Sequence, residues 1–86
     1  MFTTEFITDV FREELAREAD YRNINFTYNL EEVYKVTEKI QKSLDKFEVK
    51  AGWSYEEQEQ VYAERLVTLL DRAVNGFINL KVLLSN

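Results

Sequence analysis

The chain has 86 residues, of which 45% are hydrophobic, and a formal net charge of −5. This length suits one domain with a modest core, so we expect residues 1–86 to form a single domain. The chain contains neither cysteine nor histidine, which excludes disulfides, thiol chemistry, the commonest metal ligand and the commonest base near neutral pH. Carboxylates are therefore the candidate catalytic groups.

The N-terminus and the hydropathy pattern give no sign of export or of a membrane span. The opening stretch MFTTEFITDVFREE carries acids early and has no basic start followed by an apolar run, unlike a signal peptide. No apolar stretch approaches the roughly 20 residues that a bilayer-spanning helix needs. We therefore expect a cytoplasmic protein that does not contact a membrane.

The first predicted helix covers about residues 4–20, where apolar side chains recur at helical spacing. Glu5 lies in its first turn, where a negative charge is favourable beside the helix dipole. Glu14 falls inside the apolar arc of the same helix. Two interpretations of Glu14 remain open: the end of the helix extends past the core, or a buried carboxylate pairs with Arg17 or Arg22.

The second predicted helix begins after Asn29, because Asn29 and Glu32 have the spacing of a capping pair. Its apolar rhythm holds as far as Ala51, and Gly52 then suits a left-handed stop. The turn to the third helix is then very short, so these two helices should pack as an antiparallel hairpin.

Ser54 and Glu57 repeat the capping chemistry and open the third helix. Apolar residues on either side of Asn75-Gly76 share one phase, and a glycine inside a helix costs only about 1 kcal/mol against alanine. We expect one helix of about 30 residues through this pair, with a break or kink there as the main alternative. Its predicted core face consists of Tyr55, Tyr62, Leu66, Leu69, Leu70, Ala73, Phe77, Leu80 and Leu84.

An α+β fold is the competing interpretation, because residues 23–29 and 46–53 alternate apolar and polar side chains and could pair as strands. Against it, Phe47 and Ala51 are in phase with the preceding helix. The stretch 21–28 is then an aromatic connector, and its four apolar side chains should be covered by the bundle: Tyr21, Ile24, Phe26 and Tyr28. The predicted fold class is all-α, a small three-helix bundle with an N-terminal helix and a long antiparallel hairpin.

The third helix is apolar over a wider arc than its core face requires. Val67, Val74 and Ile78 form a flanking line beside that face. Either this helix is central and touches both others, or the flank is an interface for a partner, with a homodimer among the candidates. Together with the connector, the predicted partner-binding set is Val67, Val74, Ile78, Val82, Leu83, Tyr21, Phe26 and Tyr28.

Five lysines lie along one face of the second helix, opposite its apolar stripe: Lys35, Lys39, Lys42, Lys46 and Lys50. This row is either a solvated face with weak ion pairs or an electrostatic contact for an acidic protein surface or a phosphate backbone. No aromatic residue interleaves the row and no arginine supports it. We therefore do not expect direct nucleic-acid binding.

The acids suggest two further hypotheses. The first is that five of them bind magnesium, as in all-α nucleotide pyrophosphatases of the MazG type: Glu13, Glu14, Glu18, Glu57 and Glu64. The spacing does not match, because Arg17 stands where that family has its third acid. The second is nucleic-acid mimicry, which usually needs a denser carboxylate array than 16 acids offset by 11 bases.

We therefore expect a non-enzymatic, small, acidic helical protein that binds and modulates or inhibits a macromolecular protein partner. Antagonists, antitoxins, immunity proteins and phage-encoded proteins are the classes that such a chain suggests, and no residue chooses among them. No catalytic, cofactor-binding or metal-binding residue is predicted. The alternatives are a carboxylate–magnesium hydrolase of nucleotides and a nucleic-acid-mimicking inhibitor of a DNA-binding protein.

Overall fold

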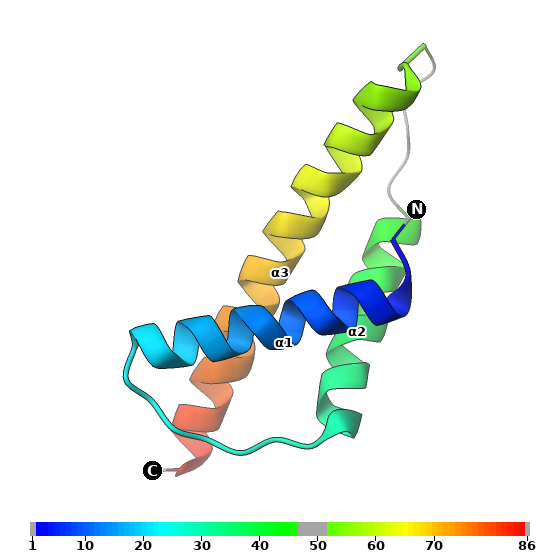
Figure 1. Ribbon diagram of the computed structural model, residues 1–86. Helices are drawn as coiled ribbons and strands as arrows, with labels where there is room; N and C mark the ends of the chain where they lie inside the picture. The colour runs from blue at the N-terminus through cyan, green and yellow to red at the C-terminus, as the bar shows by residue number, and fades with distance from the viewer. Residues whose placement is uncertain (1, 47–51, 86) are drawn as a thin grey trace.

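The computed structural model describes residues 2–46 and 52–85. In this part of the chain there are three α-helices and no strand: α1 (Thr4–Tyr21), α2 (Leu30–Asp45) and α3 (Tyr55–Ser85). Helices α2 and α3 run in opposite directions at an angle to each other, and α1 packs across them (Figure 1). The all-α prediction is confirmed. The strand predicted as an alternative at 23–29 is absent, and most of the second, 47–51, lies outside the described residues.

Polar caps set both ends of α1. The Thr3 hydroxyl accepts a hydrogen bond from the Phe6 backbone N–H at 3.0 Å. At the other end Asn23 adopts a left-handed backbone, with φ of 56°, and Ile24 N–H donates to the Ala19 carbonyl at 2.9 Å. Asparagine is the residue besides glycine that tolerates this conformation most readily, so it ends the helix where no glycine is available.

The predicted capping box of α2 is confirmed. Asn29 Oδ1 accepts from the Glu32 backbone N–H at 2.9 Å, and Glu32 Oε2 accepts from the Asn29 N–H at 3.0 Å. The structure describes α2 as far as Asp45, with Lys46 as its cap, and the predicted end at Ala51 lies outside the described residues. Leu44 is the last described α2 side chain that the core buries.

The very short turn predicted between the second and third helices falls largely outside the described residues, since 47–51 lie between the described end of α2 and the start of α3 at Tyr55. Gly52 is left-handed, with φ of 93°, as expected of a stop, but it does not directly follow α2. Ser54 Oγ accepts from the Glu57 N–H at 3.1 Å, which confirms the predicted start of α3. Helix α3 then runs 31 residues without a break at Asn75-Gly76, as predicted.

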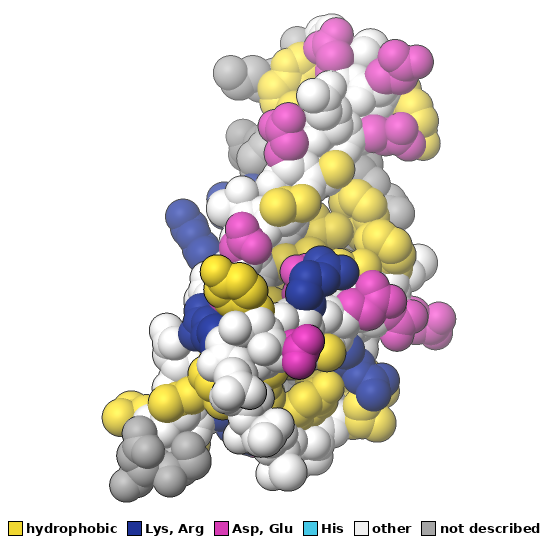
Figure 2. Space-filling model, turned by 60° about the vertical axis from the view of Figure 1, so that its left-hand side comes forward, with side chains coloured by type: hydrophobic (Ala, Val, Ile, Leu, Met, Phe, Trp, Pro, Cys, Tyr) yellow, Lys and Arg dark blue, Asp and Glu magenta, His cyan; other side chains and the backbone are white. Residues whose placement is uncertain are grey.

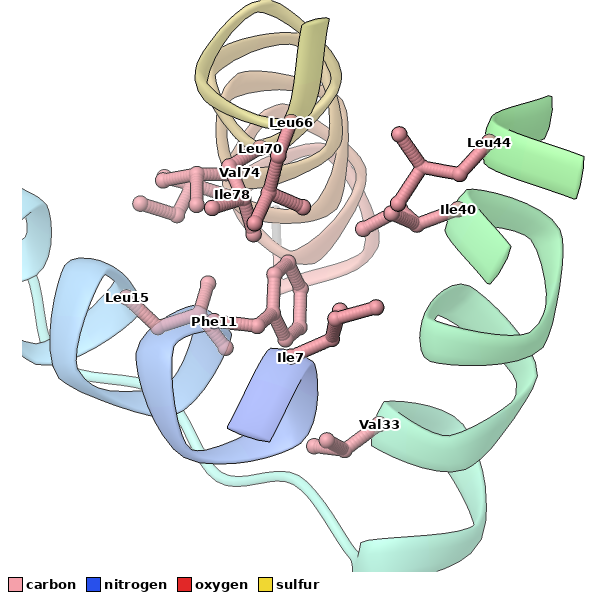
Figure 3. Close-up of a cluster of buried hydrophobic side chains, with 10 residues drawn as sticks. All are labelled: Ile7, Phe11, Leu15, Val33, Ile40, Leu44, Leu66, Leu70, Val74 and Ile78. Carbon is pink, nitrogen blue, oxygen red and sulfur yellow. The ribbon is translucent and has the colours of Figure 1, made fainter. Parts of the chain in front are cut away.

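All three helices contribute to one core, in which ten apolar side chains point toward one another (Figure 3). They are Ile7, Phe11, Leu15, Val33, Ile40, Leu44, Leu66, Leu70, Val74 and Ile78. Of the two interpretations of the flank, the central-helix one holds at two positions, since Val74 is 5% exposed and Ile78 is fully buried. Because α1 packs on that side of α3, Val74 and Ile78 belong to the core, whereas Val67 stays 58% exposed.

The predicted core face of α3 is correspondingly wrong at its ends. Tyr55 and Leu84 are each 73% exposed, and Leu80 is 55% exposed. Tyr55 stands at the start of α3, which projects beyond the other two helices (Figure 1). Leu80 and Leu84 lie on the side of α3 that neither α1 nor the connector covers.

The connector packs on the bundle through its aromatic rings. The Phe26 and Tyr28 rings lie 6.2 and 5.8 Å from the Phe77 ring, centroid to centroid, and Ile24 also packs against the core. The prediction that the connector covers the bundle is thus confirmed for three side chains. It is wrong for Tyr21, which is 86% exposed because it ends α1 on the side away from the core.

Two polar clusters tie the C-terminal half of α3 to the rest of the molecule. The Arg22 guanidinium donates to Asn75 Oδ1 at 2.5 Å and to Asn79 Oδ1 at 3.1 Å. Lys81 Nζ donates to both Glu32 carboxylate oxygens, at 2.8 and 3.0 Å. This ammonium, together with the Asn29 N–H, holds the pKa of the Glu32 carboxyl below its usual value of 4.5. Both clusters join residues far apart in the chain.

Candidate partner-binding groove

The surface between α2 and α3 contains an open apolar groove of about 380 Å³. Helix α1 contributes no lining residue. Four residues of α2 and six of α3 form the walls: Val36, Lys39, Ile40 and Ser43, with Leu69, Arg72, Ala73, Gly76, Phe77 and Leu80. We call this surface the α2–α3 groove. Packing of α1 therefore covers one side of the helix pair and leaves this side uncovered.

Small residues contribute to the groove. Ser43 on α2 and the pair Ala73 and Gly76 on α3 are among its lining residues, beside larger ones such as Ile40 and Phe77. A Cβ atom added at Gly76 would meet no heavy atom within 4 Å. Gly76 is also not left-handed, since Gly52 is the glycine with a positive φ in the described chain. The glycine is thus required neither by internal packing nor by backbone conformation.

The rim of the groove is basic. Lys39 and Arg72 stand on its opposite walls, both are exposed, and no acid is among its lining residues. Neither base forms an ion pair within the described part of the chain. The groove therefore presents two uncompensated positive charges beside apolar walls.

The predicted lysine row continues this basic edge along α2. Lys35, Lys42 and Lys46 are exposed, and Lys35 lies 3.8 Å from a Glu31 oxygen, a weak and screened pair. Lys50 lies outside the described residues. At about 100° per residue the row borders the groove-lining side of α2, which Val36 and Ser43 occupy.

The structure separates the predicted partner-binding set rather than forming one surface from it. Val74 and Ile78 belong to the core, while Phe26, Tyr28 and Val82 are half-buried. The exposed members are Tyr21, Val67 and Leu83, at 86%, 58% and 71%. Leu83 lies one turn beyond Leu80 and extends the groove-side stripe toward the C-terminus.

The sequence prediction missed the groove because it assigned its α3 wall to the core. Leu69, Ala73, Gly76, Leu80 and Leu83 follow each other at spacings of four, three, four and three residues. This is the spacing of a helix-to-helix contact seam. At the centre of this series are two small residues, Ala73 and Gly76. Such residues allow another helix to approach closely, but they bury little apolar surface themselves.

The acids of α1 are paired along their own helix. The Arg17 guanidinium donates to the Glu14 carboxylate, and Arg22 Nε donates to Glu18 at 2.8 Å. Glu14 retains 36% of its side-chain exposure, so it is a surface acid with an arginine partner and not a buried one. Among the described residues, no group of three or more acids lies close enough to hold a metal ion.

Comparisons of the chain with models of protein families, with curated proteins and with solved structures find no match. No described helix is both long and apolar enough to cross a bilayer. Functional inference therefore rests on the geometry of the α2–α3 groove and on the charges around it.

Proposed function

We propose that this protein is a non-enzymatic, cytoplasmic binding protein that modulates or inhibits a protein partner, and that the α2–α3 groove is its contact surface. The main support for this proposal is the presence of a glycine at position 76. It lies in the middle of a 31-residue helix, where glycine costs about 1 kcal/mol against alanine. Neither a close contact nor the backbone conformation requires it in the described part of the chain. A partner that approaches the α3 backbone closely would require it.

The apolar walls support the same proposal. Leu80, 55% exposed, lines the groove, and Leu83 and Leu84 beyond it are more than 70% exposed. Exposed large apolar side chains that gather beside a groove are typical of protein contact sites, whereas scattered ones are ordinary. The groove is open along its length, so it suits side chains of a macromolecule better than an enclosed small molecule.

The proposal is tested by affinity capture from lysate of the source cells, with three baits. Gly76→Leu adds a large side chain to the groove, at a position where the added Cβ itself meets nothing within 4 Å. Thr68→Leu is the matched control, because Thr68 is exposed on α3 outside the groove lining. We expect a protein, identified by mass spectrometry, that wild type and Thr68→Leu retain and Gly76→Leu loses.

Equal capture by all three baits would place the contact elsewhere and contradict the assignment of the groove. Thermal melting of each bait checks the fold. Both leucine variants should melt at or above the wild-type temperature, because each replaces a weaker helix former at an exposed site.

A further inference from the structure

We propose that the occupant of the α2–α3 groove is an amphipathic helix of the partner with acidic residues flanking its apolar face. This inference rests on the proposed function and names the chemistry of the partner segment. It follows from three observations: the shape of the walls, the bare backbone at the centre of α3, and the sign of the charges at the rim.

The walls favour a helix over an extended segment. Both are α-helices whose backbone N–H and C=O groups are used internally, so the groove offers no free edge to which a strand could add. The α3 wall runs from Leu69 to Leu80, which is about three turns or roughly 16 Å at 1.5 Å per residue. An occupant helix would therefore present apolar side chains over about three turns, at i, i+3 or i+4, and i+7.

The centre of the wall allows close contact. Ala73 and Gly76 lie about one turn apart on the groove side of α3 and leave its backbone uncovered. Helix axes approach to about 8 Å where small residues meet, and to about 10 Å where large ones do. Leu69 and Leu80 stand at either end of this gap, where they would bracket the occupant.

The charges at the rim of the groove favour an occupant of negative charge. Lys39 on α2 and Arg72 on α3 are exposed, lie on opposite walls and have no acidic neighbour in the lining. The chain as a whole carries a net charge of −5, so the groove is a locally basic site on an acidic protein. Acids flanking an apolar stripe would pair with both walls, whereas a basic helix would meet like charges.

One group of acids lies away from the groove, on the end of α3 that projects from the bundle. Figure 2 shows acidic side chains clustered there, at the top of the molecule. This projecting end carries Glu56, Glu57, Glu59 and Glu64 and no lysine or arginine from residue 52 to 64.

A second copy of this chain does not satisfy the rim. A two-fold contact through the groove would bring Lys39 and Arg72 of one copy toward the same residues of the other. The like charges would oppose the association. The partner is therefore assigned as a different chain that supplies its own acids.

The test selects helices from three displayed peptide libraries that share randomised apolar positions and differ in their flanks. The flanking residues are glutamate in one library, glutamine in the second and lysine in the third. The full-length protein is the target. We expect enrichment from the glutamate library, and the best clones should bind at least about tenfold more tightly than their lysine-flanked versions.

Matched variants locate the bound helix. Gly76→Leu should weaken binding by at least about tenfold, and Thr68→Leu should leave it unchanged. Arg72→Glu should weaken it, whereas Arg12→Glu makes the same charge change on the exposed face of α1 and should have little effect at physiological salt.

The outcomes separate this inference from the function on which it rests. Clones that lose binding in Gly76→Leu but come equally from the glutamine or lysine library overturn the acidic occupant and leave the groove as the contact site. A dimer in sedimentation that Gly76→Leu abolishes overturns it in favour of a second copy. If no library yields a clone that is sensitive to Gly76→Leu, both the occupant and the groove are wrong.

Discussion

The two halves of α3 differ although they form one continuous helix. The C-terminal half, from residue 69 to 85, packs against α1, α2 and the connector, and Arg22 and Lys81 tie it down. The N-terminal half, from residue 55 to 65, projects past the bundle and is mostly exposed (Figure 1). Helical order in the C-terminal half thus depends on long-range packing, whereas in the N-terminal half it depends on local caps and helix propensity. The groove lies on the packed half, since its α3 wall runs from Leu69 to Leu80.

The largest expected difference between the two halves follows from removal of core contacts in the packed half. Ile78→Ala should lower the free energy of unfolding by about 2–5 kcal/mol, because Ile78 is fully buried and a cavity remains. Val67→Ala is the control on the same helix, since Val67 is 58% exposed, and it should change stability by less than about 0.5 kcal/mol. Urea denaturation measures both. Similar losses for the two variants would show that this face of α3 is not the core.

Arg22 tests whether polar ties hold the packed half in place. Arg22→Ala removes the hydrogen bonds to Asn75 and Asn79 and should lower the free energy of unfolding by about 1–2 kcal/mol. Arg17→Ala removes only an exposed pair with Glu14 on the same helix, so its effect should stay below about 0.5 kcal/mol. Chemical denaturation of the two variants compares them, and an equal effect would contradict the tie between α1 and α3.

Substitutions between glycine and alanine compare how much helix propensity contributes to stability in the two halves of α3. Gly76→Ala should raise the free energy of unfolding by up to about 1 kcal/mol, because the added methyl group meets nothing within 4 Å. Ala63→Gly, at an exposed position of the projecting half, should lower it by less than this amount if that half frays before the bundle unfolds. Thermal melts followed by circular dichroism measure both changes. Destabilisation by Gly76→Ala would mean that the groove is closed at its centre.

The smallest expected effect is a pH dependence that belongs to the packed half. Interaction with Lys81 and the Asn29 N–H lowers the pKa of Glu32 below 4.5, so the folded state favours the ionised form. Its contribution to stability is present above pH 4.5 and is lost as the pH falls through the lowered pKa. Glu32→Gln should therefore reduce the acid sensitivity of unfolding below pH 4.5. An unchanged acid profile would mean that Glu32 and Lys81 do not pair in solution.

Tyr55 gives the corresponding test in the projecting half. A hydrogen bond to Glu59 and the negative charge of that residue raise the pKa of Tyr55 above 10.0. The sign is opposite to that of Glu32: the stabilisation is present below pH 10.0 and is lost as the pH rises through the raised pKa. A spectroscopic titration should show Tyr55 ionising at a higher pH in the wild type than in Glu59→Gln.

Local signals in the sequence determined the three helices and most of their starts. The capping residues at Asn29 and Ser54 predict helix starts correctly, because a cap satisfies backbone N–H groups within three residues along the chain. The shared phase of the apolar residues across Asn75-Gly76 likewise predicts one continuous α3. The described end of α2 at Asp45 was not predictable in this way, since the apolar rhythm of the sequence continues past that residue.

Only the tertiary structure decided which face of α3 is core and which is free. Helix α3 is apolar around much of its circumference, so periodicity alone could not choose between Val74 with Ile78 and Leu69 with Leu80. Helix α1, which ends at Tyr21, far before α3 begins at Tyr55, crosses α3 on the first side and leaves the second open. The location of the groove depends on that crossing, because burial requires a partner surface, and no local pattern specifies where a distant helix will lie.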